Sequence, residues 1–185
     1  MQIKVDYNVG GINGLHVITP KIWPDARGYF YETYNQNDML EAGININFVQ
    51  DNQSKSVKGV LRGLHFQKNF PQTKLVRVIS GRVYDVAVDV RKNSPTFGKY
   101  YGIELTAENK KQFLIPKNFA HGFLVLSDEA EFCYKCDDFY HPNDEGGIIF
   151  NDPEINIAWP EVDVDYIMSD KDKILPLLKS LKEAF

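Results

Sequence analysis

Turn-forming residues interrupt this chain at short intervals, and their spacing is the feature that most constrains its fold. Between the glycine, proline and asparagine clusters lie short runs rich in Val, Ile, Tyr and Phe. β-branched and aromatic side chains pack well on a pleated surface, so such runs are typical of β-strands. Many short strands separated by turns predict an antiparallel sandwich or barrel. We expect strands at residues 15–19, 29–34, 60–66, 75–79, 82–90, 101–105, 112–115, 122–126 and 131–135.

The run 82–91 alternates most clearly, with a period of two. One face carries Tyr84, Val86, Val88 and Val90, and the other carries Asp85, Ala87, Asp89 and Arg91. One face is therefore apolar and the other charged, as in a strand with two different environments. The turn Ser80-Gly81 predicts a hairpin with the strand before it.

Helical signals are few. A short helix is expected over 37–42, and apolar spacing predicts an amphipathic helix over 173–184, with Pro176 in its first turn. Ser169 followed by Asp172 resembles a capping box at the start of that helix. No repeat or linker interrupts the chain. The 185 residues are therefore expected to form one domain, 1–185, a β-barrel or sandwich with a short helical tail.

The net charge is −4, from 21 basic and 25 acidic residues. Such a balance supplies no broad attraction for nucleic acid or an anionic membrane, so an anionic ligand would need a local cluster of Arg and Lys. No signal peptide or membrane-length apolar run is visible. We therefore expect a soluble, cytoplasmic protein without nucleic-acid or membrane partners. Cys133 and Cys136 are too few for a disulfide framework, and we expect buried thiols.

Several common motifs are absent from the sequence. There is no phosphate-binding loop of the G-x-x-x-x-G-K-[ST] type, no dinucleotide-binding fingerprint in a strand–helix context and no G-x-S-x-G elbow. The four histidines include no H-x-H pair. A metal site built from His65 and His121 stays possible on this pattern but is not favoured, and we expect no metal.

Arg62, His65 and Lys74 are polar residues in strand-like surroundings. Strict alternation places Arg62 and His65 on opposite faces, unless a bulge at Gly63 turns both inward. Periodicity alone favours a half-buried histidine and a surface arginine. Lys74 is either a buried ammonium that calls for an anionic partner or a solvated lysine at a strand start. By the same reasoning Tyr134 is a core aromatic.

Taken together, ten segments in order along the chain resemble the dTDP-4-dehydrorhamnose 3,5-epimerase family, the RmlC-like cupins. They include Gly59-Val-Leu-Arg-Gly-Leu-His-Phe-Gln67 and Ile115-Pro-Lys-Asn-Phe-Ala-His-Gly-Phe123. The other segments are 25–32, 48–52, 74–77, 85–98, 134–135, 151–153, 157–160 and 169–172. The resemblance implies an all-β fold, a cupin or jelly-roll double-sheet barrel with short peripheral helices and a C-terminal helical tail.

The resemblance also implies a cofactor-free double epimerisation of a dTDP-linked 4-keto-6-deoxy hexose, in the synthesis of dTDP-L-rhamnose. His65 matches the family's base, Asp172 its carboxylate partner, Tyr134 the acid, and Lys74 the cation near the C4 oxygen. Positions that match substrate-binding residues are Arg27, Glu32, Gln50, Asn52, Arg62, His121, Tyr140, Glu145 and Lys171. Tyr140 is a candidate to stack on thymine. The family forms homodimers, in which N-terminal strands can bring Arg27 and Glu32 to the neighbouring site.

Two departures from the family pattern are mild. Gln53 replaces a frequent histidine, and Phe139 replaces a common tyrosine. Two alternatives stay open, namely an epimerase acting at C3 or C5 alone and a sugar- or metal-binding cupin without catalysis. Tyr134 favours the double reaction, because reprotonation needs an acid on the far face of the sugar.

Overall fold

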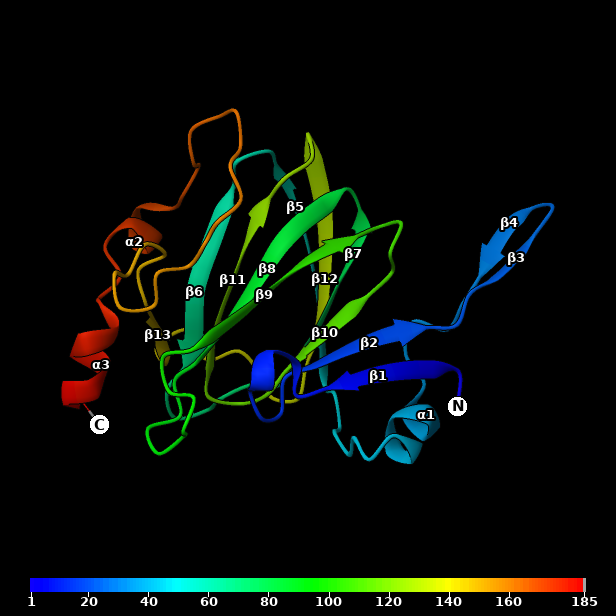
Figure 1. Ribbon diagram of the computed structural model, residues 1–185, viewed down its shortest axis with the longest axis horizontal. Helices are drawn as coiled ribbons and strands as arrows, with labels where there is room; N and C mark the ends of the chain where they lie inside the picture. The colour runs from blue at the N-terminus through cyan, green and yellow to red at the C-terminus, as the bar shows by residue number, and fades with distance from the viewer. Residues whose placement is uncertain (185) are drawn as a thin grey trace.

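Two antiparallel β-sheets lie face to face and form the body of the molecule (Figure 1). The computed structural model describes residues 1–184. The six-stranded sheet has the order β1 (Ile3–Tyr7), β2 (His16–Pro20), β10 (Gln112–Ile115), β7 (Lys74–Ser80), β12 (Glu129–Cys136) and β5 (Gln50–Val57). The five-stranded sheet has the order β13 (Glu145–Gly147), β6 (Leu61–Gln67), β11 (Phe119–Val125), β8 (Arg82–Asp89) and β9 (Tyr100–Thr106). The expected all-β double-sheet fold is confirmed.

Apolar side chains from both sheets fill much of the space between them. Val76, Phe113 and Phe132 come from the six-stranded sheet and pack against Val83 and Phe123 of the five-stranded sheet. All five are almost completely buried. The two inner faces interdigitate as in a β-sandwich, and this core fixes how the sheets sit relative to each other.

The outer face of the five-stranded sheet is covered as well. Val86 and Val88 of β8 pack against Ile148, Ile155 and Leu178 from the C-terminal part of the chain. Both faces of β8 are therefore buried, and the charged face predicted from the alternation is the inner one. Charged side chains in such a strand need local partners, since an unpaired buried charge is costly.

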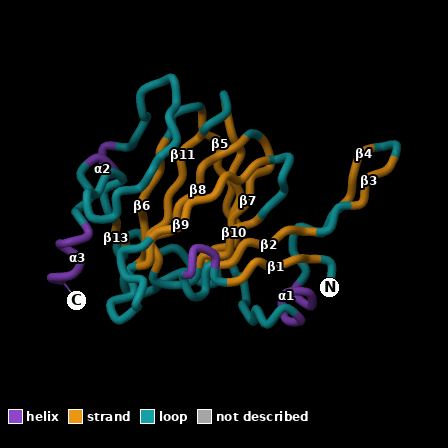
Figure 2. The backbone as a smooth tube through the Cα atoms, in the orientation of Figure 1, coloured by secondary structure: helices purple, strands orange, loops and turns teal. Residues whose placement is uncertain are grey.

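The helices are short and lie at the edge of the fold (Figure 2). The helix expected at 37–42 is α1, Gln36–Glu41, whose cap Asn35 accepts from two backbone N–H groups. The single helix predicted over 173–184 is wrong, because the chain forms α2, Asp170–Lys173, and α3, Leu178–Ala184. Pro176 lies between them. It prevents a continuous helix, because proline disfavours helical geometry in the residue before it. A 3-10 turn spans Val9–Gly11.

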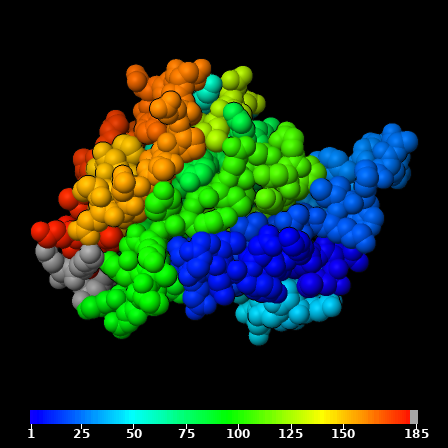
Figure 3. Space-filling model, in the orientation of Figure 1, coloured from blue at the N-terminus to red at the C-terminus, as the bar shows by residue number. Residues whose placement is uncertain are grey.

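Four strands were not predicted: β1, β5, β13 and β3 (Trp23–Asp25). Strand β5 has the polar sequence QDNQSKSV and no apolar alternation, yet it pairs along its full length with β12. The strand expected at 29–34 is also wrong in extent, because β4 covers Gly28–Phe30. β3 and β4 form a separate hairpin that projects from the body (Figure 3).

None of the helices in residues 1–184 is long and apolar enough to cross a membrane.

Candidate active site

A cavity of about 770 Å³ lies between the two sheets, beside α2. Eight of the predicted site residues line it, and they come from six different elements. They are Asn52 (β5), Arg62 and His65 (β6), Lys74 (β7), His121 (β11), Tyr134 (β12), and Lys171 and Asp172 (α2). Residues spread over 120 positions of the chain therefore meet in one place.

Arg62 and His65 both line this cavity because β6 is irregular between them. The register of β6 against β11 shifts opposite His121 and Phe123. Gly63 has φ 114°, and a Cβ atom there would lie 2.6 Å from the Gly122 Cα. The position therefore requires glycine on two grounds, a conformation that side chains rarely adopt and a close backbone approach. The bulge at Gly63, left open by the sequence pattern, is present.

His65 and Asp172 form a close pair, with 2.6 Å between the His65 Nε2 and the Asp172 Oδ1. The Asp172 side chain is 5% exposed, and its other oxygen accepts from the Gly63 N–H at 3.4 Å. Ser169 caps α2 by accepting from the Asp172 N–H. The expected capping box is thus half formed, because the Asp172 carboxylate is directed to His65 instead. Burial lowers the pKa of His65 below its usual value, Asp172 opposes this, and Lys74 and Lys171 add to the lowering.

Tyr134 reaches the cavity from the opposite sheet. His65 belongs to the five-stranded sheet and Tyr134 to the six-stranded sheet, so the two side chains enter from facing walls. Burial raises the pKa of the Tyr134 phenol above its ordinary value. The phenol therefore keeps its proton at neutral pH, which suits a proton donor.

Lys74 lies in the wall next to Tyr134, with its Nζ 5.9 Å from the centre of the tyrosine ring. Within the described part of the chain, no carboxylate forms an ion pair with Lys74. Burial lowers the pKa of Lys74, while Cys136, Asp85 and Glu145 oppose that shift. The sequence allowed either a buried ammonium or a solvated lysine at this position, and in the structure Lys74 faces the cavity. A cation without a bonded anion in a cavity suits an anionic ligand or a developing negative charge.

A second histidine–aspartate pair lies deeper in the wall. The His121 Nε2 is 3.0 Å from both oxygens of Asp85, which is completely buried. Burial raises the pKa of Asp85, and His121 and Lys74 counteract this. Sequence reasoning missed Asp85. The alternation in 82–91 had placed it on the charged face, but did not reveal that it meets His121 in the cavity wall.

Three further predicted residues lie next to the cavity and are tied to residues that line it. The Gln50 side chain donates to the Asn52 Oδ1 at 2.9 Å and accepts from the Tyr140 N–H at 3.2 Å. Glu145 forms an ion pair with Lys171. The pKa of Glu145 is lowered, since bonds from Lys171 and Tyr140 outweigh the effect of burial. Gln50, Tyr140 and Glu145 therefore extend the site at one side.

Arg27 and Glu32 are not brought to the cavity within one chain. Arg27 lies in the projecting hairpin, pairs with Asp25, and has a side chain that is 90% exposed. Glu32 accepts from the Asn35 amide at 3.1 Å.

The two cysteine thiols differ from each other in burial. Cys136 is buried with its pKa raised to about 11, mainly by burial, but Cys133 is half-buried, contrary to expectation.

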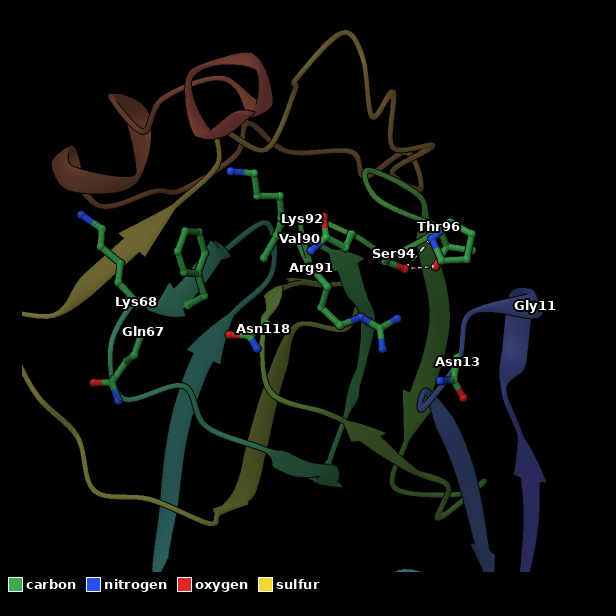
Figure 4. Close-up of a pocket in the computed structure, with 13 residues that line it drawn as sticks. Gly11, Asn13, Gln67, Lys68, Val90, Arg91, Lys92, Ser94, Thr96 and Asn118 are labelled. Carbon is green, nitrogen blue, oxygen red and sulfur yellow. Dashed lines mark hydrogen bonds between the residues drawn. The ribbon is translucent and has the colours of Figure 1, made fainter. Parts of the chain in front are cut away.

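A second cavity of about 580 Å³ contains none of the predicted site residues (Figure 4). Lys68, Arg91 and Lys92 line it, and Arg91 is held by the buried Asp89. In the part of the chain that the structure describes, no three His, Cys, Asp or Glu side chains come together in a way that would hold a metal ion. The acid–base constellation therefore belongs to the first cavity.

The fold and the first cavity define a class, a cupin-type barrel with a histidine–carboxylate pair and a tyrosine on facing walls. Residues 10–180 match the family model "dTDP-4-dehydrorhamnose 3,5-epimerase". A relative of that name from Methanothermobacter thermautotrophicus is 53% identical over 163 residues, 88% of each chain. The chain belongs to the dTDP-4-dehydrorhamnose 3,5-epimerase family.

Solved structures agree with this assignment. The RmlC epimerase of Legionella pneumophila, in complex with dTDP-4-keto-L-rhamnose, is 49% identical with a TM-score of 0.91, and the match covers 96% of this chain and 93% of that one. The 3′-monoepimerase ChmJ of Streptomyces bikiniensis, in complex with dTDP-quinovose, is 31% identical with a TM-score of 0.89, covering 97% and 90%. The same fold therefore serves both double and single epimerases.

Proposed function

We propose that this protein is a dTDP-4-dehydrorhamnose 3,5-epimerase, which inverts C3 and C5 of dTDP-4-dehydro-6-deoxy-D-glucose to give dTDP-4-dehydro-L-rhamnose. One observation carries the proposal. The His65–Asp172 pair and Tyr134 enter a single cavity from opposite sheets, with the Lys74 ammonium beside Tyr134. Inversion at carbon needs a base on one face and an acid on the other, and this geometry supplies both.

His65 acts as the base. In the neutral ring, the Nε2–H donates to Asp172, which leaves the Nδ1 lone pair free to accept a proton. The C4 ketone acidifies the hydrogens on C3 and C5, so His65 removes one proton and the electron pair moves to the C4 oxygen as an enolate. Lys74 neutralises that developing charge, and Asp172 stabilises the imidazolium.

Tyr134 then donates its proton to the same carbon from the opposite face, and the configuration at that carbon is inverted. The enolate collapses to the ketone, leaving His65 protonated and Tyr134 ionised. Exchange with solvent restores both groups before the second carbon reacts. The steps move only protons, so the proposal requires neither a metal nor a cofactor. Arg62 and His121 line the same cavity and share in stabilising the enolate.

The diphosphate and base of the substrate need cations and an aromatic surface. Lys171 and Arg62 provide positive charge within one chain, and Tyr140 provides an exposed ring for thymine. Arg27 and Glu32 are supplied by the partner of a homodimer, through the β3–β4 hairpin. The projection of this hairpin and its exposed Phe30 support that arrangement.

We also infer that residues 1–185 form one cupin domain acting in the cytoplasm.

The test is an assay with dTDP-4-keto-6-deoxyglucose in D₂O, followed by NMR. We expect deuterium at both C3 and C5 of the product, because each carbon loses a proton to His65 and regains one from a solvent-exchanged Tyr134. Deuterium at one carbon alone would identify a single-position epimerase. Nucleotide-sugar binding without exchange would identify a binding cupin. Either result contradicts the proposal.

A further inference from the structure

Residues 137–144 connect β12 to β13 and carry Tyr140, which is proposed to meet the thymine. Glu145, at a predicted substrate-binding position, follows directly as the first residue of β13. This connection has little regular structure, so its own backbone does not fix its position. Two buried polar side chains hold it instead. One is Gln67 at the end of β6, and the other is Asp144 within the connection itself. Neither was singled out as a site residue by the sequence patterns.

Gln67 uses both ends of its amide to hold this connection. Its Nε2 donates to the Phe139 carbonyl at 3.3 Å and to the Phe70 carbonyl at 2.8 Å. Its Oε1 accepts from the His141 N–H at 2.7 Å. The residues on both sides of Tyr140 are therefore bonded to one side chain, which is 6% exposed. The position of Tyr140 follows from that of Gln67.

Asp144 makes the second set of bonds. Its carboxylate accepts from the Asn69 N–H, the Asn69 side-chain amide and the Phe70 N–H, at distances between 2.6 and 3.1 Å. The Asp144 carbonyl also accepts from the Lys68 N–H at 3.1 Å. The pKa of Asp144 is lowered, because these bonds outweigh the opposing effect of burial. The carboxylate thus stays ionised and binds the connection to residues 68–70, directly after β6.

Both sets of bonds lead to the strand that carries the proposed base. Gln67 lies two residues after His65 on β6, and Gln67 pairs in register with Glu145 of β13. We propose that Gln67 and Asp144 are positioning residues, which hold Tyr140 and Glu145 at a fixed place relative to His65 and so set the affinity for the nucleotide part of the substrate. This inference rests on the proposed function of the site.

A purely structural role would predict a different outcome, and the chain offers a matched control. Asp152 is also a buried carboxylate that accepts from three backbone N–H groups, those of Glu154, Ile155 and Leu178. It holds the start of α3, and in the described part of the chain its side chain bonds to none of the proposed site residues. Asp144→Asn and Asp152→Asn each replace one accepting oxygen of a buried carboxylate by an NH₂ group, the first beside the site and the second away from it.

The experiment compares Asp144→Asn, Gln67→Met and Asp152→Asn with the wild type. For each protein we would measure kcat and KM with dTDP-4-keto-6-deoxyglucose, Kd for dTDP by calorimetry, and the melting temperature. Asp144→Asn and Gln67→Met should raise KM and Kd about tenfold, as expected when buried hydrogen bonds are lost, and change kcat less than about threefold. Asp152→Asn should lower the melting temperature but leave KM and Kd unchanged.

Several results would overturn the positioning role. These are an unchanged Kd for dTDP in both site variants, an equal rise in Kd with Asp152→Asn, or a loss confined to kcat. If Asp144→Asn fails to fold, Gln67→Met carries the test alone, because it replaces one neutral side chain by another of similar shape. Wild-type protein that binds dTDP without turnover would refute the proposed function, while the comparison of Kd values would still decide the positioning role.

Discussion

At the scale of single residues, the protonation of His65 decides whether the site can start its reaction. Burial is the largest influence and lowers the pKa of the imidazole, and Lys74 and Lys171 act in the same direction. Asp172 acts in the opposite direction but does not reverse the shift. The ring is therefore neutral at pH 7 and can accept a proton. Acid should inactivate the enzyme, with a midpoint below the ordinary histidine value of about 6.5.

The contribution of Lys74 can be measured on His65 directly. Replacing Lys74 with Met removes a positive charge that disfavours the imidazolium, so the pKa of His65 should rise. An NMR titration of the His65 ring protons would measure this shift independently of activity. Lys68→Met, in the second cavity, is the control and should leave the titration unchanged. An unaltered or lower pKa in Lys74→Met would contradict the electrostatic account.

Removal of the base should separate chemistry from binding. His65→Ala should lower kcat by at least about a hundredfold, in line with the loss of a general base, and leave Kd for dTDP within about threefold. The fold should survive, because the imidazole is partly exposed in the cavity wall. Single-turnover kinetics and calorimetry would measure the two quantities. Full activity in this variant would show that another group removes the proton.

At the scale of elements, the sequence predicted most strands and the kinds of residue in the site, but not which face each residue occupies. The alternation in β8 separated Asp85 from Val86 correctly. It did not show that the C-terminal segment covers the Val86 face and leaves Asp85 inside, because that contact joins positions far apart in the chain. Similarly, β5 is polar and its pairing with β12 is tertiary, so local preference could not predict it.

The bulge in β6 gives a prediction at this scale. Gly63→Ala introduces a Cβ 2.6 Å from the His121 carbonyl oxygen at a φ of 114°, so backbone must move. We expect a loss of roughly 2–3 kcal/mol in the free energy of unfolding from overpacking, together with a lower kcat as Arg62 and His65 are displaced. Denaturant unfolding and steady-state kinetics would measure both.

Gly43→Ala is the matched control for that variant. Gly43 also has a positive φ, but a Cβ there would meet nothing within 4 Å. Its substitution should cost about 1 kcal/mol through backbone conformation alone and leave kcat unchanged. Equal losses of stability in the two variants, with kcat unchanged in both, would show that the close approach at Gly63 does not shape the site.

At the scale of the whole molecule, the projecting hairpin leaves one chain with an incomplete set of predicted substrate-binding residues. The β3–β4 hairpin places Arg27 away from the cavity and exposes Tyr29 and Phe30 by 60% and 66%. Exposed aromatic side chains on a projecting element are typical of a protein–protein contact. The homodimer therefore stays a prediction with a definite geometric requirement: the hairpin must reach the partner's cavity.

Mixed dimers test this requirement. Arg27→Ala and His65→Ala homodimers should each be weakly active. If the hairpin serves the partner, a heterodimer of the two has one intact site, and random exchange should restore about one quarter of wild-type activity. If the hairpin serves its own chain, no site is intact and mixing restores nothing. Assaying the mixture after partial unfolding and refolding would distinguish the two arrangements.

The packing of the two sheets has a consequence for how far apart the proton-transferring groups stand. His65 and Tyr134 belong to different sheets, and the stacked rings of Phe123 and Phe132, with centroids 4.3 Å apart, lie between those sheets and line the same cavity. This aromatic pair therefore sets the distance between the two sheets at the site. A smaller residue at Phe123 or Phe132 would change the separation of the two sheets. The distance between His65 and Tyr134, which the sugar ring must fill, would then change although no acid or base had been altered.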